Sequence, residues 1–204
     1  MPSEILSTVQ VGGLELSPGD HVCAFYPTKV ERDEILLPYL VEGMHAGAKC
    51  IAVLDADDGA DIVDELAAAL GPEIPAPDQL ALHTSGDTYL ATGSFSTDAM
   101  LDFWEKSVGG AFEHGFSFAR VAGEMTWALS KLPGVEQLVG YEAKLNRFLP
   151  RFPQVILCLY ELERFDGEVL VDVLKTHPKV LLGGMLLANP YYIEPDEFLA
   201  SREP

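Results

Sequence analysis

The stretch Leu16–Leu54, LSPGDHVCAFYPTKVERDEILLPYLVEGMHAGAKCIAVL, decides the fold of this chain. His21–Tyr26 is a short apolar run after a Pro-Gly-Asp turn signal, which predicts a buried strand. Apolar residues at helical spacing then predict a helix over Glu31–His45, which Gly47 ends. Lys49–Leu54 is a second apolar run of strand length. A strand, a helix and a strand within about 35 residues form one βαβ crossover, so the sheet is expected to be largely parallel.

The turn between the first strand and its helix has no phosphate-binding signature. P-loop proteins carry glycines and a Lys-Ser/Thr pair there, because backbone N–H groups must surround the phosphates. Here the turn reads YPTKVERDE, with no glycine and with three acidic residues that would repel a triphosphate. Two interpretations stay open: an ordinary turn with acidic capping, or a P-loop-like frame that has lost its phosphate site and acquired another function.

The rest of the chain continues the alternation of strands and helices. Periodicity predicts helices over 57–71, 97–114, 134–148 and 166–176, and strands over 79–83, 118–127, 154–161 and 179–189, the last interrupted by Gly183-Gly184. Residues 85–96 are expected to form a mobile loop and 190–204 a polar tail. The pattern predicts an α/β fold, a three-layer sandwich with a mainly parallel sheet. One domain is expected to cover 1–204, with a core from about 16 to 195.

Composition excludes several classes of protein. The 204 residues include 48% hydrophobic ones, but no apolar run reaches the length of a membrane span, so a cytoplasmic protein is expected. A formal charge of −19 argues against direct nucleic-acid binding. It suits a basic protein partner, although solubility is the simpler explanation. Three cysteines in predicted strands indicate a reducing compartment without a disulfide framework.

Polar and aromatic residues gather at the predicted carboxyl ends of strands, where open parallel sheets bind ligands. Tyr26, Tyr160 and the segment from Glu124 to Trp127 end three such strands. If these strands are neighbours, the residues form an aromatic pocket for a small organic molecule. Arg120 lies four positions before Glu124 and faces the same side, either as an internal ion pair or as a polar anchor for a ligand.

Histidines and cysteines form a second candidate group. His21 and Cys23 point to one face of the first strand, Cys158 is expected on an adjacent strand, and His177 ends a helix. Together they could bind a metal, with His21 and Cys23 as the first candidates. The spacing contains no CxxC, HxxxH or HExxH motif, so core residues with internal partners, and no bound metal, are the simpler interpretation. A mid-strand thiol is not expected to be a nucleophile. Outside this group, Glu142 could contribute a second acid to the ligand pocket around Arg120 and Glu124, although a solvated helix face is the simpler interpretation.

The motifs DHVCAFY, KCIAVL, ARVAGEMTW, GYEAKLNRFL, VILCLYE and NPYYIEP, in this order, resemble the MEDS domain, a sensory domain of methanogens and methylotrophs. The resemblance covers about Gly19 to Pro195. It implies a RecA/KaiC-like frame without a P-loop, in which HVCAFYPTKVERDE replaces the phosphate loop and AGEM the Walker B strand. It also implies that His21 and Cys23 belong to a sensing site for simple hydrocarbon derivatives in prokaryotic signalling. Because such domains are often fused to other modules, the chain is expected to be a stand-alone sensor or part of a longer protein.

The leading hypothesis is a non-enzymatic, cofactor-free small-molecule sensor that acts through a protein partner in a signalling or transcription complex. Homodimer formation stays open. The expected ligand-binding residues are His21, Cys23, Tyr26, Arg120, Glu124, Trp127, Cys158, Tyr160 and His177. A ligand-free acidic module that docks on a basic transcription or sigma-factor regulator is the alternative. A His/Cys metal-dependent sensor is a lesser one. The missing GK[ST] motif argues against a residual ATPase.

Overall fold

The computed structural model describes residues 9–11, 14–55, 59–71 and 78–202. Its central strands are β3 (His21–Tyr26), β4 (Lys49–Leu54), β5 (Leu80–Thr84), β6 (Ala119–Glu124), β7 (Gln154–Glu161), β8 (Lys179–Leu182) and β9 (Met185–Ala188). They form a seven-stranded sheet in the order β5-β4-β6-β7-β3-β8-β9. Neighbours are parallel except for β9, which runs antiparallel to β8. Separately, β1 (Val9–Val11) and β2 (Leu14–Leu16) pair as an antiparallel hairpin.

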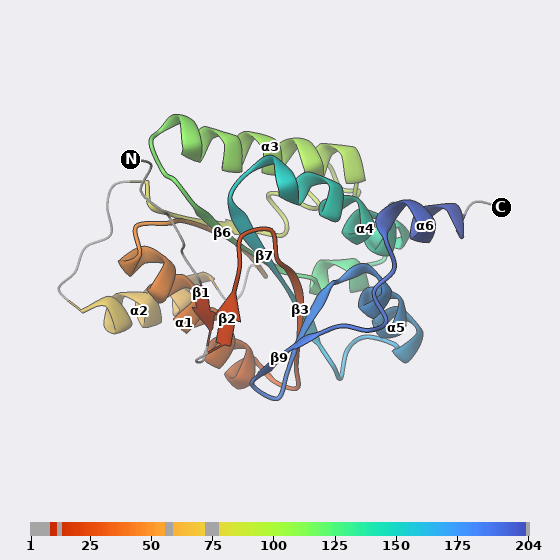
Figure 1. The fold of residues 1–204 in the computed structure, drawn as a ribbon, viewed down its shortest axis with the longest axis horizontal. Helices are drawn as coiled ribbons and strands as arrows, with labels where there is room; N and C mark the ends of the chain where they lie inside the picture. The colour runs from red at the N-terminus through yellow and green to blue at the C-terminus, as the bar shows by residue number, and fades with distance from the viewer. Residues whose placement is uncertain (1–8, 12–13, 56–58, 72–77, 203–204) are drawn as a thin grey trace.

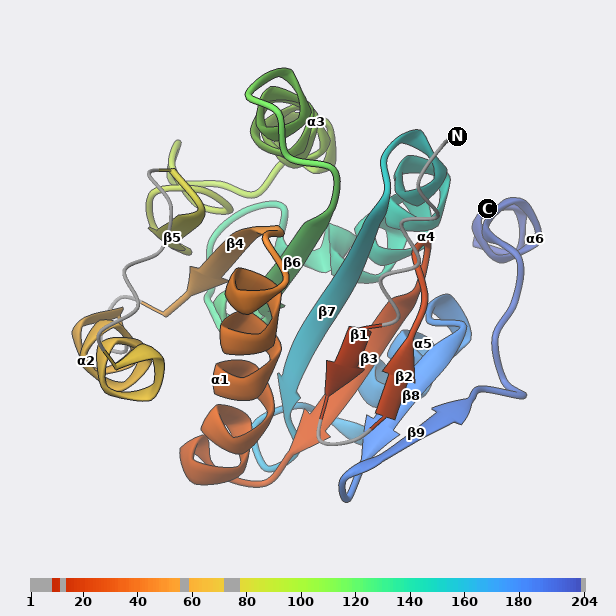
Figure 2. The same ribbon diagram turned by 60° about the vertical axis from the view of Figure 1, so that its left-hand side comes forward.

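Helices cover both faces of this sheet. They are α1 (Lys29–His45), α2 (Gly59–Leu70), α3 (Thr97–Glu113), α4 (Leu138–Phe148), α5 (Gly167–Thr176) and α6 (Pro195–Ala200), with short 3-10 helices at Thr126–Leu129, Val135–Gln137 and Leu149–Arg151. Figure 1 shows α1 and α2 on one side of the sheet and α3 and α4 on the other, and Figure 2 shows the same arrangement turned by 60°. The structure therefore confirms the predicted three-layer α/β fold.

The core consists of two layers that the sheet separates. Along β3, Val22, Ala24 and Tyr26 pack toward α1, while Cys23 and Phe25 pack toward α3, α4 and α5. Every residue of β3 is buried, as expected for a central strand that helices cover on both faces. This explains why the sequence shows an unbroken apolar run here rather than an alternating one.

The predicted bounds of three strands, β3, β4 and β7, match the structure. The strand predicted over 179–189 breaks at Gly183-Gly184, as expected, but the two parts form an antiparallel pair, β8 and β9, joined by Gly183 (φ +56°) and Gly184 (φ +75°). Two successive glycines with positive φ suit a two-residue hairpin turn, which sends β9 back along the sheet edge. The tail predicted over 190–204 contains the short helix α6. The predicted loop, 85–96, forms turns, and its Tyr89 and Phe95 are buried in the core.

Among the described residues, no helix combines the length and the apolar character that a membrane crossing requires.

Two glycines with nearly equal positive φ angles allow a stability test. Gly134 (φ +91°) enters the Val135–Gln137 turn, and an added Cβ would lie 2.1 Å from the carbonyl oxygen of Phe95. Gly19 (φ +93°) has nothing within 4 Å of such a Cβ. We expect Gly19→Ala to lower the free energy of unfolding by about 1 kcal/mol through backbone strain alone. Gly134→Ala should lower it by about 3 kcal/mol, because the backbones must also separate.

Urea unfolding monitored by tryptophan fluorescence measures both losses. Equal losses in the two variants would contradict the close approach of Gly134 to Phe95.

Candidate functional site

A buried ion pair fills the end of the sheet where the phosphate loop is missing. Arg32, near the start of α1, is 2% exposed, and its guanidinium lies 3.3 Å from the carboxylate of Glu124 at the end of β6. The Tyr26 hydroxyl donates to the same carboxylate at 3.0 Å, and so does the backbone N–H of Asp55 at 3.0 Å. Side chains of the chain itself therefore occupy the region above β3 and β6 on the α1 face.

Arg120 and Glu124 face the same side of β6, as predicted, but each has its ion partner on α1. The Arg120 guanidinium donates to the Tyr39 carbonyl and lies 3.9 Å from the Glu42 carboxylate. Glu124 pairs with Arg32 instead. Two separate pairs thus take the place of the internal pair expected between these residues, and they fasten α1 along the whole length of β6.

The sheet separates the residues expected to form one rim. Tyr26 and Glu124 bond to each other on the α1 face, whereas Trp127 and Tyr160 belong to the opposite core layer. Successive strand residues point to opposite faces, and the 3-10 turn after β6 carries Trp127 across. Trp127 stacks there on Tyr89, with ring centroids 4.6 Å apart. The structure therefore does not bring Tyr26, Arg120 and Glu124 together with the other predicted site residues.

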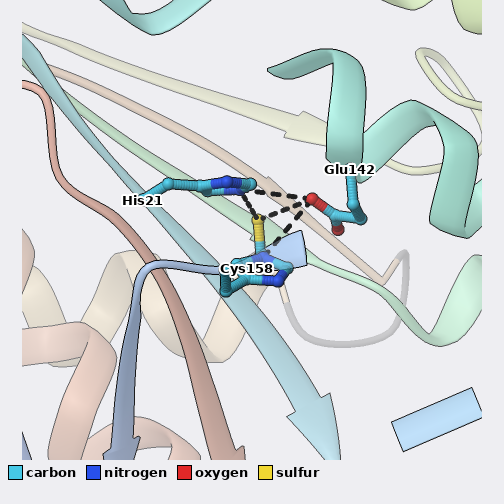
Figure 3. Close-up of side chains that lie close together, drawn as sticks. His21, Glu142 and Cys158 are labelled. Atoms are coloured by element: carbon cyan, nitrogen blue, oxygen red, sulfur yellow. Dashed lines mark hydrogen bonds and ion pairs between the residues drawn. The ribbon is translucent and has the colours of Figure 1, made fainter. Parts of the chain in front are cut away.

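On the opposite face, four polar side chains from separate elements converge. His21 begins β3, Glu142 lies on α4, Cys158 lies in β7 and His177 follows α5. One ligand-type atom from each lies within 4.8 Å of the other three, and all four residues are at most 2% exposed. The Glu142 Oε2 atom lies 3.2 Å from His21 Nε2, 3.5 Å from His177 Nε2 and 3.5 Å from Cys158 Sγ. Figure 3 shows Glu142, His21 and Cys158 directed toward a common centre.

Hydrogen bonds to the outer nitrogens orient both imidazoles. Asn146 donates its amide N–H to the Thr176 carbonyl at 2.7 Å, which turns its Oδ1 toward His21 Nδ1 at 3.1 Å. His177 Nδ1 lies 2.8 Å from the Val173 carbonyl, which can only accept. Both Nδ1 atoms are therefore assigned as donors, so either ring, when neutral, presents an Nε2 lone pair to the cluster.

Burial and charge set the protonation of this cluster. Burial, together with the neighbouring His177, lowers the pKa of His21 to about 4. Burial alone would raise the pKa of Glu142, but the two histidines outweigh it and hold the pKa below its ordinary value. Burial and the Glu142 carboxylate raise the pKa of the Cys158 thiol and of the Tyr160 hydroxyl. An ionised carboxylate thus lies beside a neutral His21, a protonated thiol and a phenol that donates to it at 2.5 Å.

Glu142 is the member that the sequence analysis did not assign to this group. A solvated helix face was one expectation, and that expectation is wrong, because Glu142 is 0% exposed. The missed signal is helical spacing, since Leu138, Leu145 and Leu149 stand at i−4, i+3 and i+7 and are all buried. Cys23, by contrast, lies outside the four, with its thiol 3.7 Å from the Lys179 carbonyl.

An apolar cleft of about 310 Å³ lies next to this cluster, between α4, α5 and the Thr126–Leu129 turn. Its apolar lining includes Leu129, Leu138, Val139, Phe165 and Val169. One contact and one shared helix connect the cleft with the cluster. The Phe165 ring of the cleft meets edge-on, at 5.2 Å, the ring of Tyr160, whose hydroxyl donates to Glu142. Helix α4 carries both Leu138 of the cleft and, one turn later, Glu142 of the cluster.

Comparison with known proteins identifies the family. The family model described as "MEthanogen/methylotroph, DcmR Sensory domain" matches residues 20–178. The chain belongs to the MEDS family. This MEDS domain is also 30% identical over 169 residues to the transcriptional repressor DcmR of Methylorubrum extorquens. The match covers 82% of this chain but 62% of the repressor, so the chain spans less than two thirds of that relative's length. Both matches support a sensory, regulatory role.

Solved structures confirm the RecA/KaiC-like frame of this MEDS domain. A KaiC-like protein from Pyrococcus horikoshii gives a TM-score of 0.53 at 15% identity, covering 80% of this chain and 70% of that one. The flagellar accessory protein FlaH from Methanocaldococcus jannaschii gives 0.51 at 10% identity, with coverages of 89% and 84%. An ATPase from the type III secretion system of pathogenic bacteria gives 0.53 at 13% identity, with coverages of 93% and 63%. At these identities the likeness is one of fold alone.

Substitutions in the Arg32–Glu124 pair test whether this buried ion pair stabilises the fold. Arg32→Met leaves the buried Glu124 carboxylate without its guanidinium, so the free energy of unfolding should fall by about 3 kcal/mol. Adding Glu124→Gln removes the uncompensated charge, and the double variant should be more stable than Arg32→Met by about 1 kcal/mol. Chemical denaturation of the wild type, both single variants and the double variant closes this cycle. Strictly additive losses would argue against a coupled pair.

Proposed function

We propose that this MEDS domain is a non-enzymatic sensor that binds a small, weakly polar organic molecule and passes its state to a protein partner in transcriptional regulation. Its family is one of sensory domains, and its relative DcmR is a transcriptional repressor. The likeness to an ATPase fold does not favour hydrolysis here. Arg32, Glu124 and Tyr26 occupy the region where a P-loop protein holds phosphates. The turn YPTKVERDE between β3 and α1 contains no glycine whose backbone could surround a phosphate.

The observation that carries the proposal is the apolar cleft beside a buried polar cluster. A volume of about 310 Å³ suits a molecule of a few carbon atoms, and simple hydrocarbon derivatives are of this kind. Among its polar lining, Asp172 and Arg202 pair with each other at 2.7 Å. Glu136 and Glu168 also line the cleft, so its wall combines an apolar surface with one ion pair and two further carboxylates.

The position of the cleft supports a signalling role. A ligand changes an equilibrium only if it binds two states unequally, and this cleft lies between helices that can differ in spacing. Helix α4, which forms one wall of the cleft, is also the surface on which α6 packs, because Val139 and Ala143 of α4 contact Phe198 of α6. A shift of α4 would therefore move α6 at the surface. With a net charge of −19, the chain suits a partner that presents a basic surface.

Ligand binding can be tested with a panel of small alcohols, aldehydes and halogenated alkanes, followed by calorimetry and by tryptophan fluorescence. Trp127 lies in the turn that lines the cleft, so a bound molecule should change its emission. Val169→Trp places a large side chain in the cleft and should weaken binding at least about tenfold.

Val171→Trp is the matched control. Val171 lies two positions further along α5 and is 52% exposed, so the same substitution there should leave affinity unchanged. No response to any compound of the panel, or equal loss in both variants, would contradict this assignment of the cleft.

The non-enzymatic part of the proposal has its own test. Calorimetric titration of the wild-type chain with ATP and Mg²⁺ should show no binding, because carboxylates and a paired guanidinium fill the phosphate region. Saturable heat, or release of inorganic phosphate, would contradict it.

A further inference from the structure

We propose that His21, Glu142, Cys158 and His177 form a binding site for a four-coordinate divalent transition metal, with Zn²⁺ as the ion that fits best. The proposal concerns the buried cluster alone and does not depend on an organic ligand in the cleft. Its support is geometric and comes from four separate elements of the fold, β3, α4, β7 and the end of α5.

Four of the six separations between ligand atoms of the cluster are close to those of a tetrahedral coordination shell, and the other two are at most 4.8 Å. Zinc bonds nitrogen and oxygen at roughly 2.0–2.2 Å and thiolate sulfur at about 2.3 Å, so ligand atoms at tetrahedral corners stand about 3.3–3.6 Å apart. Three contacts of Glu142 Oε2 measure 3.2, 3.5 and 3.5 Å, and Cys158 Sγ lies 3.4 Å from His21 Nε2. An ion at the centre therefore requires only small shifts of the side chains.

Hydrogen bonding within the cluster is incomplete without a cation. When both rings are neutral, with their Nδ1 atoms donating outward, two Nε2 lone pairs and a carboxylate face one another, and the only donor among the four is the Cys158 thiol. One thiol proton cannot serve all these acceptors. His177 Nε2 is buried and lies 3.5 Å from the Glu142 carboxylate, so among the described residues a neutral ring leaves this atom without a hydrogen-bond partner. A buried acceptor of this kind is costly unless something positive approaches it.

The charges balance when the ion binds. Coordination breaks the Cys158 S–H bond and forms a metal–sulfur bond, and the proton leaves to solvent. The thiolate and the Glu142 carboxylate then contribute two negative charges, which the divalent ion neutralises, while both imidazoles stay neutral. A fully buried site without net charge avoids the large desolvation penalty of an isolated ion.

The donor set selects the class of metal. Two imidazole nitrogens, one thiolate and one carboxylate suit zinc and its first-row neighbours, whereas Mg²⁺ and Ca²⁺ prefer shells of oxygen. Metal-bound histidines usually donate their other ring N–H to a carbonyl or amide oxygen, as His21 does to Asn146 and His177 does to Val173. The second shell of a metal site is therefore in place around both rings.

The test uses the full chain, purified without a His-tag and without chelators. Elemental analysis should find about one zinc ion per chain. After the metal is stripped, Co²⁺ should restore a visible spectrum typical of four-coordinate cobalt, with a thiolate-to-cobalt charge-transfer band. Zinc should also raise the melting temperature, because it binds only the folded arrangement.

Two alanine variants give a matched comparison. Cys158 and Cys23 lie opposite each other on paired strands, both buried in the same core layer, but only Cys158 belongs to the four. Cys158→Ala should lower zinc affinity at least about a hundredfold and remove the charge-transfer band. Cys23→Ala should keep both.

Three outcomes would overturn the proposal. They are a folded wild-type chain that takes up neither Zn²⁺ nor Co²⁺, equal affinities in the two alanine variants, and a cobalt spectrum without a thiolate band. The wild-type spectrum decides the question even if Cys158→Ala does not fold. Because these readouts involve no organic compound, their failure would be distinct from a failure of the ligand panel.

Discussion

The buried carboxylate of Glu142 is the constraint on which the α4 side of the molecule depends. A negative charge that is 0% exposed must be compensated within the protein, and every partner comes from another element. His21 approaches from β3, Cys158 and Tyr160 from β7, and His177 from the end of α5. One side chain on α4 thus fixes the position of that helix against the centre of the sheet. The same helix supplies a wall of the apolar cleft and the seat of α6.

A second buried carboxylate, Glu124, gives the opposite face of the sheet a different character. There Arg32 supplies a permanent positive charge and Tyr26 a hydroxyl donor, so the network is complete. This ion pair fills the end of β6, so the chain combines a RecA/KaiC-like architecture with side chains of its own above β3 and β6. Polar groups that face one another have instead accumulated on the α3, α4 and α5 side.

Sequence patterns predicted the α/β fold but not the arrangement of the residues in the candidate site. The apolar runs HVCAFY, KCIAVL and QVILCLYE predicted β3, β4 and β7, because a strand covered on both faces needs apolar residues throughout. The three strands expected to share a rim, β3, β6 and β7, are indeed neighbours. The path of the turn after β6 is not encoded in strand periodicity, however, so the sequence does not show that Tyr26 and Trp127 lie on opposite sides of the sheet. Strand periodicity allowed His21 and Cys158 to be expected in one group. The burial of Glu142 was not predicted, because a single acid in an amphipathic helix normally faces water. The only signal of its inward direction was the set of apolar residues at helical spacing around it.

The topology of β3 also constrains how the chain can acquire its structure. This strand is complete by residue 26, yet both of its neighbours, β7 and β8, come from residues 154–182. During synthesis both edges of β3 therefore stay without their native partners until most of the polypeptide has emerged from the ribosome. Long separations of this kind slow folding and favour intermediates with exposed apolar surface. This interior strand of the finished sheet thus acquires both of its neighbours only after residue 182 has been made.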